Sequence, residues 1–215
     1  MRITWVLPHA GTSGGIRVAA IYAQRLAARG HDVHVVSTPI RLPSYKDAIK
    51  SLLRGRGWAR WKYSTDSHFD GVPVSHTRID RDRAIVDSDV PDADVIIATW
   101  WETAHWVAAM SPSKGAKAHF IQHYEIFGGP PAEVDASWRL PLHRIVISQW
   151  LRDLARDKFG DDQVSHVPNS VDLGQFRALH RGRQQRPTVG LLYSVVRFKG
   201  VDVAFKAIEE VRRRG

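Results

Sequence analysis

Three glycines stand within five positions of the segment PHAGTSGGIR, residues 8–17, directly after the first apolar run of the chain. A glycine-rich turn that leads into a helix offers open backbone N–H groups and the positive end of the helix dipole, and both bind phosphate. Glycines also serve simply to permit a tight turn between a strand and a helix. The segment is therefore either an anion-binding loop or a turn.

Two common phosphate-binding motifs do not fit this segment. The glycines are spaced G-x-x-G-G, whereas the dinucleotide fingerprint is G-x-G-x-x-G, and no G-K-[ST] follows them. The second apolar run ends in Val36, Ser37 and Thr38, without the acidic residue that would hold an adenosine ribose. These differences argue against a nicotinamide dehydrogenase and against a P-loop nucleotidase, and they leave other nucleotide binders open.

A histidine, His123, follows the apolar run at residues 119–122 and is followed by Tyr124, Glu125 and the sequence GGPP at 128–131. Ligands of open α/β sheets bind at the carboxyl ends of strands, on loops such as this one. We therefore predict a functional role for His123, although a hydrogen-bonded histidine at a strand end is the alternative.

The segment TWWETAHW begins where the predicted strand at residues 95–99 ends. Its residues Trp100, Glu102 and His105 are expected to face the ligand edge of the sheet or to cap a helix. Thr99 is the predicted backbone cap.

Acidic pairs also stand before that strand, in DSDVPDADV, at Asp87 with Asp89 and at Asp92 with Asp94. Their position is the amino end of the strand, away from the ligand edge, so we interpret them as exposed turn residues and not as metal ligands. No H-E-x-x-H or comparable spacing of ligands occurs. We predict no metal site.

The apolar, β-branched runs alternate with segments of helical period, which is typical of an α/β fold. We predict a Rossmann-like parallel sheet with helices on both faces. Strands are expected at residues 3–7, 33–37, 72–77, 95–99, 119–122, 144–148, 164–167 and 188–194. Helices are expected at residues 15–29, 102–110, 149–158 and 201–213, with Gly30 and Gly160 as stops.

The sequence predicts a domain at residues 1–177 and a linker at 178–187, where ALHRGRQQRP is polar and carries three arginines. Residues 188–215 resemble the first β-α unit of a second Rossmann-like domain. One strand and one helix cannot form a core of their own. We therefore expect the chain to be the front part of a longer protein, or its last unit to pack on the first domain.

The net charge is +9, and residues 41–62 hold seven basic residues against one acid, which indicates an anionic partner. This basic stretch is predicted to be a solvated helix or a peripheral contact with an anionic membrane through Trp58 and Trp61. The chain has no cysteine, which excludes cysteine chemistry, and no long apolar run. We expect a cytoplasmic protein.

Four segments, taken in order, resemble the family 4 (group 1) glycosyltransferases. GGIRVAAIYAQRLAARGHDVHVVS is similar to the opening of their N-terminal domain, where a glycine pair, an amphipathic helix and GH-x-V-x-V follow one another. FIQHYEIF resembles the loop that carries a histidine near the donor sugar. HVPNSVDLGQF resembles the PNGVD turn, and YSVVRFKGVDVAFKAIEEV resembles the KG-x-D phosphate loop of the C-terminal domain.

This resemblance implies a GT-B architecture, in which two Rossmann-like domains face each other across a nucleotide-diphosphate sugar, and catalysis retains anomeric configuration without a metal or other cofactor. It implies that Gly14 and Gly15 approach the donor diphosphate and that His123 contacts the donor sugar at the reaction centre. Lys199 would neutralise the leaving diphosphate, with Arg197 as the nearby guanidinium.

Two positions depart from the family pattern. Ser194 stands where an arginine usually precedes the lysine, which leaves open whether Arg197 replaces it, and Ser170 stands where glycine usually follows Asn169. The acidic E-x7-E element is expected beyond Gly215. We therefore expect the chain alone to have little or no transferase activity.

The predicted function is that of a hexosyl or deoxyhexosyl transferase, which moves a sugar from a nucleotide-diphosphate sugar to a glycan, lipid-linked or other hydroxyl acceptor. The candidate acceptor-binding residues are Trp100, Glu102, His105, Tyr124 and Glu125. A nucleotide-sugar epimerase or hydrolase of the same fold is an alternative. A basic nucleic-acid-binding module is another, but it lacks an RNP motif, zinc fingers or a recognition helix pair, so no nucleic acid partner is expected.

Overall fold

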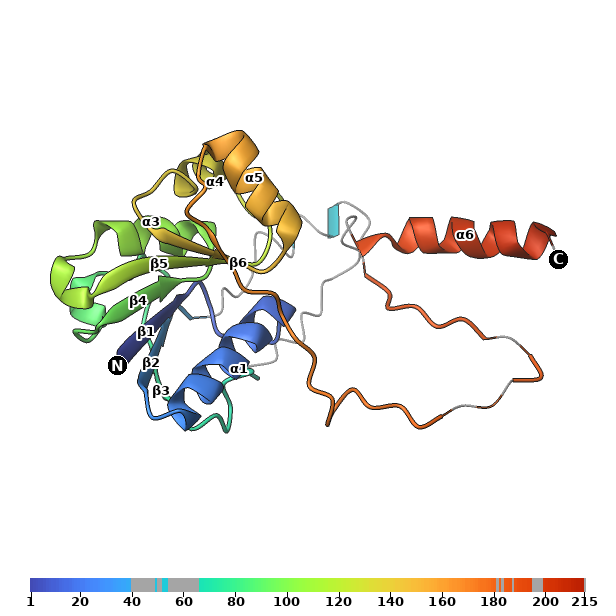
Figure 1. Ribbon diagram of the computed structural model, residues 1–215, viewed down its shortest axis with the longest axis horizontal. Coiled ribbons are helices and arrows are strands. Elements are labelled where there is room, and N and C mark those ends of the chain that lie inside the picture. The colour runs from blue at the N-terminus through green and yellow to red at the C-terminus, as the bar shows by residue number, and fades with distance from the viewer. Residues whose placement is uncertain are drawn as a thin grey trace. The chain divides into compact units, whose positions relative to one another are not determined.

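The computed structural model describes residues 1–39, 49, 52, 53, 66–180, 182, 184–186, 188–194 and 199–214. The chain divides into two compact units, Met1–Ser170 and Val171–Gly215. Most of the regular structure belongs to the first unit (Figure 1).

The described part of the first unit contains one parallel sheet of seven strands, in the order β3-β2-β1-β4-β5-β6-β7. The strands are β1 (Arg2–Leu7), β2 (Asp32–Ser37), β3 (Ser75–Arg78), β4 (Val95–Ala98), β5 (Ala116–Ile121), β6 (His143–Val146) and β7 (Ser165–His166). The strand order reverses between β1 and β4. This arrangement is Rossmann-like and confirms the predicted fold class.

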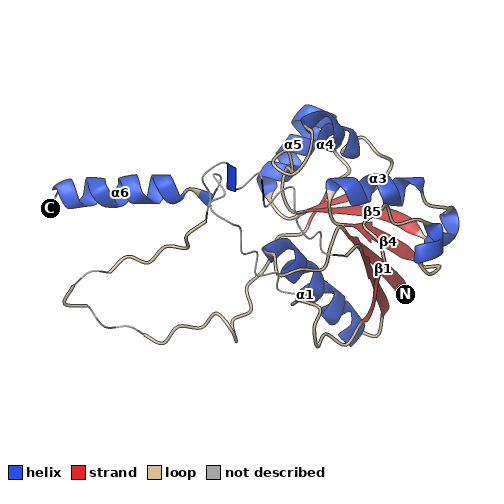
Figure 2. Cartoon of the chain, turned by 180° about the vertical axis from the view of Figure 1, so that it is seen from behind, coloured by secondary structure: helices blue, strands red, loops and turns tan. Residues whose placement is uncertain are grey.

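Helices cover both faces of the sheet. They are α1 (Gly14–Ala28), α3 (Trp101–Ala109), α4 (Pro131–Ser137) and α5 (Gln149–Phe159), and the 3₁₀ turns are η1 (Asp87–Asp89) and η2 (Pro112–Lys114). Helix α1 lies on one face, and α3, α4 and α5 lie on the other (Figure 1). Figure 2 shows the same division from behind.

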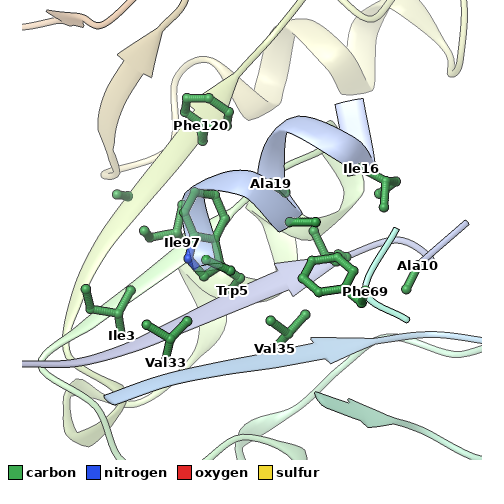
Figure 3. Close-up of a cluster of buried hydrophobic side chains, with 14 residues drawn as sticks. Ile3, Trp5, Ala10, Ile16, Ala19, Val33, Val35, Phe69, Ile97 and Phe120 are labelled. Carbon is green, nitrogen blue, oxygen red and sulfur yellow. The ribbon is translucent and has the colours of Figure 1, made fainter. Parts of the chain in front are cut away.

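The core under α1 explains why this helix forms where the sequence predicts it. Its residues Ile16, Ala19 and Ala23 share one side of the helix and belong to one buried cluster with Trp5 and Phe120 of the central strands. Figure 3 shows Ile16 and Ala19 with other members of this cluster. The rings of Trp5 and Phe120 meet edge to face with centroids 5.8 Å apart. The small alanines let the helix approach these large rings closely.

Helix ends agree with the predicted stops. Gly30 and Gly160 adopt positive φ angles of 85° and 68° after α1 and α5, a conformation that glycine adopts without strain. At the other end of α1, the Ser13 hydroxyl accepts a hydrogen bond from the Ile16 backbone N–H at 3.5 Å.

Two predicted strands need correction, and one helix was missed. Residues 188–194 form no strand, because a lone strand has nothing to pair with in the described part of the second unit. The strand predicted at residues 72–77 is β3, Ser75–Arg78, since turn hydrogen bonds occupy Val72 and Val74. Helix α4 was not predicted, because it has only seven residues; its signal was proline at its first position.

Other predictions concern the segments between these elements. The basic stretch at residues 41–62 lies outside the described residues, apart from positions 49, 52 and 53. The described residues of the predicted linker have no regular structure, and helix α6 (Val201–Arg214) follows Lys199 and Gly200 in the second unit. Within the described part of the chain, no helix is long and apolar enough to cross a membrane.

The sheet contains one fully buried histidine, His119. His119 of β5 is 1% exposed, and neither ring nitrogen has a hydrogen-bond partner among the described residues. Burial lowers the pKa of His119 to about 3, with smaller contributions from the Arg144 and His105 charges. The folded state therefore excludes a proton that the unfolded chain binds.

This exclusion predicts acid sensitivity. The free energy of unfolding should fall as the pH drops from 6.5 towards 3, by up to about 1.4 kcal/mol per pH unit for one proton. His119→Leu should remove this slope relative to wild type, which urea unfolding between pH 4 and 7 would measure. The exposed His166→Leu serves as the control, and an unchanged slope in His119→Leu would contradict the assignment.

Candidate functional site

The carboxyl ends of β1, β4, β5 and β6 meet at one edge of the sheet because these strands are parallel. Helix α1 leaves β1 towards one face, and α3 leaves β4 towards the other, so this edge contains the reversal of strand order where open α/β sheets bind ligands. Helices α1, α3 and α5 all begin here. Their positive dipole ends therefore face the same edge.

The two glycines of the α1 N-terminus have different surroundings. Gly14 and Gly15 are the first two residues of α1, so their N–H groups have no acceptor within the helix. A methyl group added to Gly14 would meet nothing within 4 Å, whereas one added to Gly15 would lie 3.2 Å from the amide nitrogen of Gln122. A side chain at position 15 would therefore have to displace the end of the Gln122 side chain by a few tenths of an ångström.

Gln122 joins the loop after β5 to helix α1. Its side-chain amide Nε2 donates a hydrogen bond to the Gly15 carbonyl oxygen at 3.1 Å, across the sheet edge. The next residue is His123, whose half-buried ring bonds through Nδ1 to the Tyr124 carbonyl oxygen at 2.9 Å. The bond from Gln122 thus holds His123 in a fixed relation to the N-terminus of α1.

Four aromatic rings form a continuous row along this edge. Trp100 follows β4, His123 and Phe127 follow β5, and Trp150 lies in the first turn of α5. The ring centroids are 5.9 Å apart for Trp100 and Phe127, 5.2 Å for Phe127 and His123, and 5.4 Å for His123 and Trp150. All three contacts are edge to face, the favoured geometry for aromatic pairs. We call these four side chains the aromatic row.

Two glycines in the β5–α4 loop make room for two tryptophans. A methyl group added to Gly128 would lie 2.4 Å from Cζ2 of Trp100, and one added to Gly129 would lie 2.5 Å from the Trp101 ring. Real Cβ atoms do not approach other atoms so closely. The GG pair therefore permits the loop to pack on both rings and is not merely a flexible hinge.

Glu125 is a buried carboxyl in the same loop. Its side chain is almost wholly covered, and its Oε2 accepts a hydrogen bond from the Trp101 backbone N–H, at the start of α3, at 2.8 Å. Burial raises the pKa of Glu125 to about 8, against the opposing effect of this hydrogen bond. Glu125 was predicted to bind the acceptor, but the structure buries it as a link between the β5–α4 loop and α3.

Tyr124 and His105, which were also predicted to bind the acceptor, have partners within the fold. The Tyr124 hydroxyl donates to Asp135, and Lys158 lies over the Tyr124 ring with its nitrogen 4.8 Å from the centroid. His105 bonds through Nε2 to the Glu133 carbonyl oxygen at 3.2 Å. These contacts tie α3, α4 and α5 together, whereas Glu102 lies half-buried in the first turn of α3.

Thr99 was predicted to cap α3, but the N-cap residue is Trp100. Trp100 precedes the helix, and the Thr103 hydroxyl oxygen accepts hydrogen bonds from the backbone N–H groups of Thr99 and Trp100 at 3.0 and 2.9 Å. The Thr99 hydroxyl donates instead to the Val6 carbonyl oxygen at 3.0 Å, between β4 and β1. Thr99 therefore stabilises the strand pair at the reversal of strand order.

The acidic pairs lie at the amino end of β4, as predicted, and have polar partners. Asp94 accepts hydrogen bonds from the Arg2 backbone N–H and guanidinium, and these bonds lower the pKa of Asp94. Asp92 accepts a hydrogen bond from the Lys114 ammonium group, which lowers the pKa of Asp92. Across the described residues, no group of three histidine or acidic side chains could hold a metal ion.

The predicted phosphate-binding residues of the second unit are only partly described. Lys199 is exposed, just before Gly200 and α6, whereas Arg197 lies outside the described residues. Binding of the donor diphosphate by Arg197 therefore stays a prediction from the sequence.

A family model, Glycosyltransferase Family 4, matches residues 12–175. This range includes the α1 N-terminus, the β5–α4 loop and the aromatic row. The chain belongs to glycosyltransferase family 4. Among solved structures, this family 4 glycosyltransferase is similar to a dodecameric FMN-dependent UbiX-like decarboxylase from Escherichia coli O157:H7, with 15% identity and a TM-score of 0.28, over 83% of this chain and 86% of that chain. No protein of curated function matches the sequence.

Three residues of this candidate site were missed by the sequence analysis: Gln122, Phe127 and Trp150. Trp150 follows a predicted strand at its carboxyl end, so the same rule that selected Trp100 could have found it. No local pattern marks Gln122 or Phe127, because their contacts join segments distant in sequence or depend on how the loop turns.

The first prediction from this site concerns Glu125. Between pH 4.5 and 8, the Glu125 carboxyl keeps its proton in the folded protein, because its pKa there is about 8, but loses it in the unfolded chain, where the ordinary pKa is 4.5. The free energy of unfolding should therefore fall as the pH rises from 4.5 to 8. Glu125→Gln keeps an acceptor for Trp101 and should remove that fall, as measured by urea unfolding at pH 5 and 8.5.

Below pH 6.5, His119 makes the free energy of unfolding rise with pH, which opposes the effect of Glu125. The effect of Glu125→Gln is therefore measured as the difference in the free energy of unfolding between variant and wild type at each pH. The exposed Glu133→Gln is the matched control. A Glu125→Gln variant with the wild-type pH dependence would show that the carboxyl does not titrate in this range.

The second prediction concerns Gly128. Gly128→Ala should lower the free energy of unfolding by about 1–3 kcal/mol, because its methyl group displaces the Trp100 ring. In a Trp100→Ala background the same change should cost much less, and Gly14→Ala should cost little in either background. Additive losses for Gly128→Ala and Trp100→Ala in chemical denaturation would refute the contact.

Proposed function

We propose that this family 4 glycosyltransferase transfers a hexosyl or deoxyhexosyl group from a nucleotide-diphosphate sugar to a hydroxyl acceptor, with retention of configuration and without a metal ion. In this proposal the first unit supplies the acceptor side of the site. The observation that carries it is the hydrogen bond between Gln122 and Gly15, because it joins the loop of His123 to the N-terminus of α1.

The proposed chemistry follows from charge. Departure of a nucleoside diphosphate develops negative charge on the leaving oxygens, and the N–H groups of Gly14 and Gly15 at the positive end of α1 can stabilise it. Lys199 is proposed to neutralise the same charge, as the family pattern implies. The donor is a substrate, and no separate cofactor is required.

His123 is proposed to contact the donor sugar. Its Nδ1 lies 2.9 Å from the Tyr124 carbonyl oxygen, which can only accept, so Nδ1 carries the hydrogen and the neutral ring has its lone pair on Nε2. Contact with a hydroxyl group of the donor sugar is the role that the proposal assigns to this ring. The bond to the backbone also fixes the plane of the ring, which favours a preorganised contact.

The test uses the full-length gene product with a panel of nucleoside-diphosphate sugars and candidate acceptors. We expect transfer to an acceptor, with the configuration of the product assigned by NMR, and His123→Ala should lower kcat by about 10²-fold or more. His31→Ala, at the opposite edge of the sheet, should leave the rate unchanged.

Other outcomes of the same assay would overturn the proposal. Donor hydrolysis or epimerisation without transfer would indicate the alternative enzymes of this fold. Equal rates for wild type and His123→Ala would remove His123 from the reaction centre.

A further inference from the structure

A turn at residues 67–72 contacts the glycine loop, residues 11–15, through one histidine. The backbone N–H of His68 donates a hydrogen bond to the Gly11 carbonyl oxygen at 3.4 Å. The ring Nε2 of His68 lies 3.0 Å from the Thr12 carbonyl oxygen, although 56 positions separate these two residues in the sequence. Because a carbonyl oxygen only accepts, Nε2 carries the hydrogen of this bond, in the neutral ring as well as in the charged one.

The turn that carries His68 is fixed by contacts of its own. The Asp70 carboxylate accepts a hydrogen bond from the Ser67 backbone N–H at 2.7 Å, and the Ser67 hydroxyl accepts one from the Phe69 N–H at 3.0 Å. The Phe69 side chain is 5% exposed and belongs to the buried cluster under α1 (Figure 3). These contacts hold the turn in place without the half-buried His68 ring, so the bond from Nε2 acts mainly on the glycine loop.

The contacts with His68 decide which way the N–H groups of the glycine loop face. In a trans peptide unit, the C=O group and the N–H group of the next residue point in opposite directions. Both carbonyls that His68 holds lie on its side of the loop, so the N–H groups of Thr12 and Ser13 face away from it. Thr12 and Ser13 are exposed, and within the described residues the N–H groups at positions 12–15 have no protein acceptor. The exposed side of the loop therefore presents hydrogen-bond donors, which suit an anion.

We propose that His68 is a positioning residue for the donor diphosphate, an inference that rests on the proposed glycosyltransferase function. Without the bond from Nε2, the peptide unit between Thr12 and Ser13 would be free to rotate. Its rotation would turn a carbonyl oxygen, with partial negative charge, towards the diphosphate in place of an N–H group. His68 thus acts through the backbone of the glycine loop and does not itself touch the substrate.

The test compares His68→Gln with His68→Asn in the full-length gene product. The amide nitrogen of Gln can occupy the place of Nε2, whereas the shorter Asn side chain ends near the place of Nδ1 and does not reach Thr12. His68→Asn should lower kcat/KM for the donor about two- to tenfold, the usual contribution of one hydrogen bond, and leave the KM for the acceptor unchanged. His68→Gln should restore most of the loss, and His31→Asn, at the opposite edge of the sheet, should have no effect.

Inorganic pyrophosphate gives a readout that does not depend on transfer. In the wild-type protein it should shift the backbone amide NMR signals of residues 12–15, and its dissociation constant should rise about two- to tenfold in His68→Asn but not in His68→Gln. Absence of these shifts, or equal affinity for pyrophosphate in wild type and His68→Asn, would overturn the proposal.

Two further results would count against a positioning role. The wild-type His68 ring, neutral at pH 8.5, should carry its hydrogen on Nε2 in ring-nitrogen NMR, and a hydrogen on Nδ1 would exclude the bond to Thr12. Equal losses in His68→Gln and His68→Asn, or a fall in kcat without any change specific to the donor, would indicate a role in stability only.

The same variants separate this inference from the proposed function. If sugar is transferred but His68→Asn keeps the wild-type donor kinetics, His68 has no positioning role and the glycosyltransferase proposal stands. If His68→Asn weakens pyrophosphate binding as expected but no sugar is transferred by the wild type, the proposed function fails and the anion-binding loop remains.

Discussion

Parallel strands must be covered on both faces, and this constraint organises the whole first unit. Helix α1 meets it on one face with a stripe of small residues, and α3, α4 and α5 meet it on the other. Each helix that returns the chain to the next strand begins at the carboxyl edge. Covering the sheet therefore also gathers the loops and helix N-termini that form the candidate site.

The β5–α4 loop shows how one short segment can connect both layers. Gln122 reaches α1 on one face, and Glu125, three residues later, reaches the start of α3 on the other. His123 and Tyr124 lie between these two anchors: His123 joins the aromatic row, and Tyr124 packs towards α4 and α5. The position of His123 is thus fixed by contacts that belong to the fold itself.

The sequence predicts the sheet well because the evidence for strands and for α1 is local. Apolar runs and the alanine stripe of α1 mark buried surfaces directly, whereas a seven-residue helix such as α4 gives too short a pattern. For the site, the edge that a residue occupies is predictable, but the direction of its side chain is not. Tyr124 and Glu125 were placed at the correct edge, yet contacts with Asp135 and Trp101 turn them into the fold.

The packing of Gly128 and Gly129 beneath two tryptophans restricts how the site could change over time. A side chain cannot enter at position 128 while the Trp100 ring lies there, but it can once that ring has become smaller. If the glycine changed first, the new side chain at position 128 would overlap the Trp100 ring and destabilise the protein. The glycine and tryptophan positions should therefore change together among relatives, with the tryptophan lost first, and two distant sequence segments would share one evolutionary history.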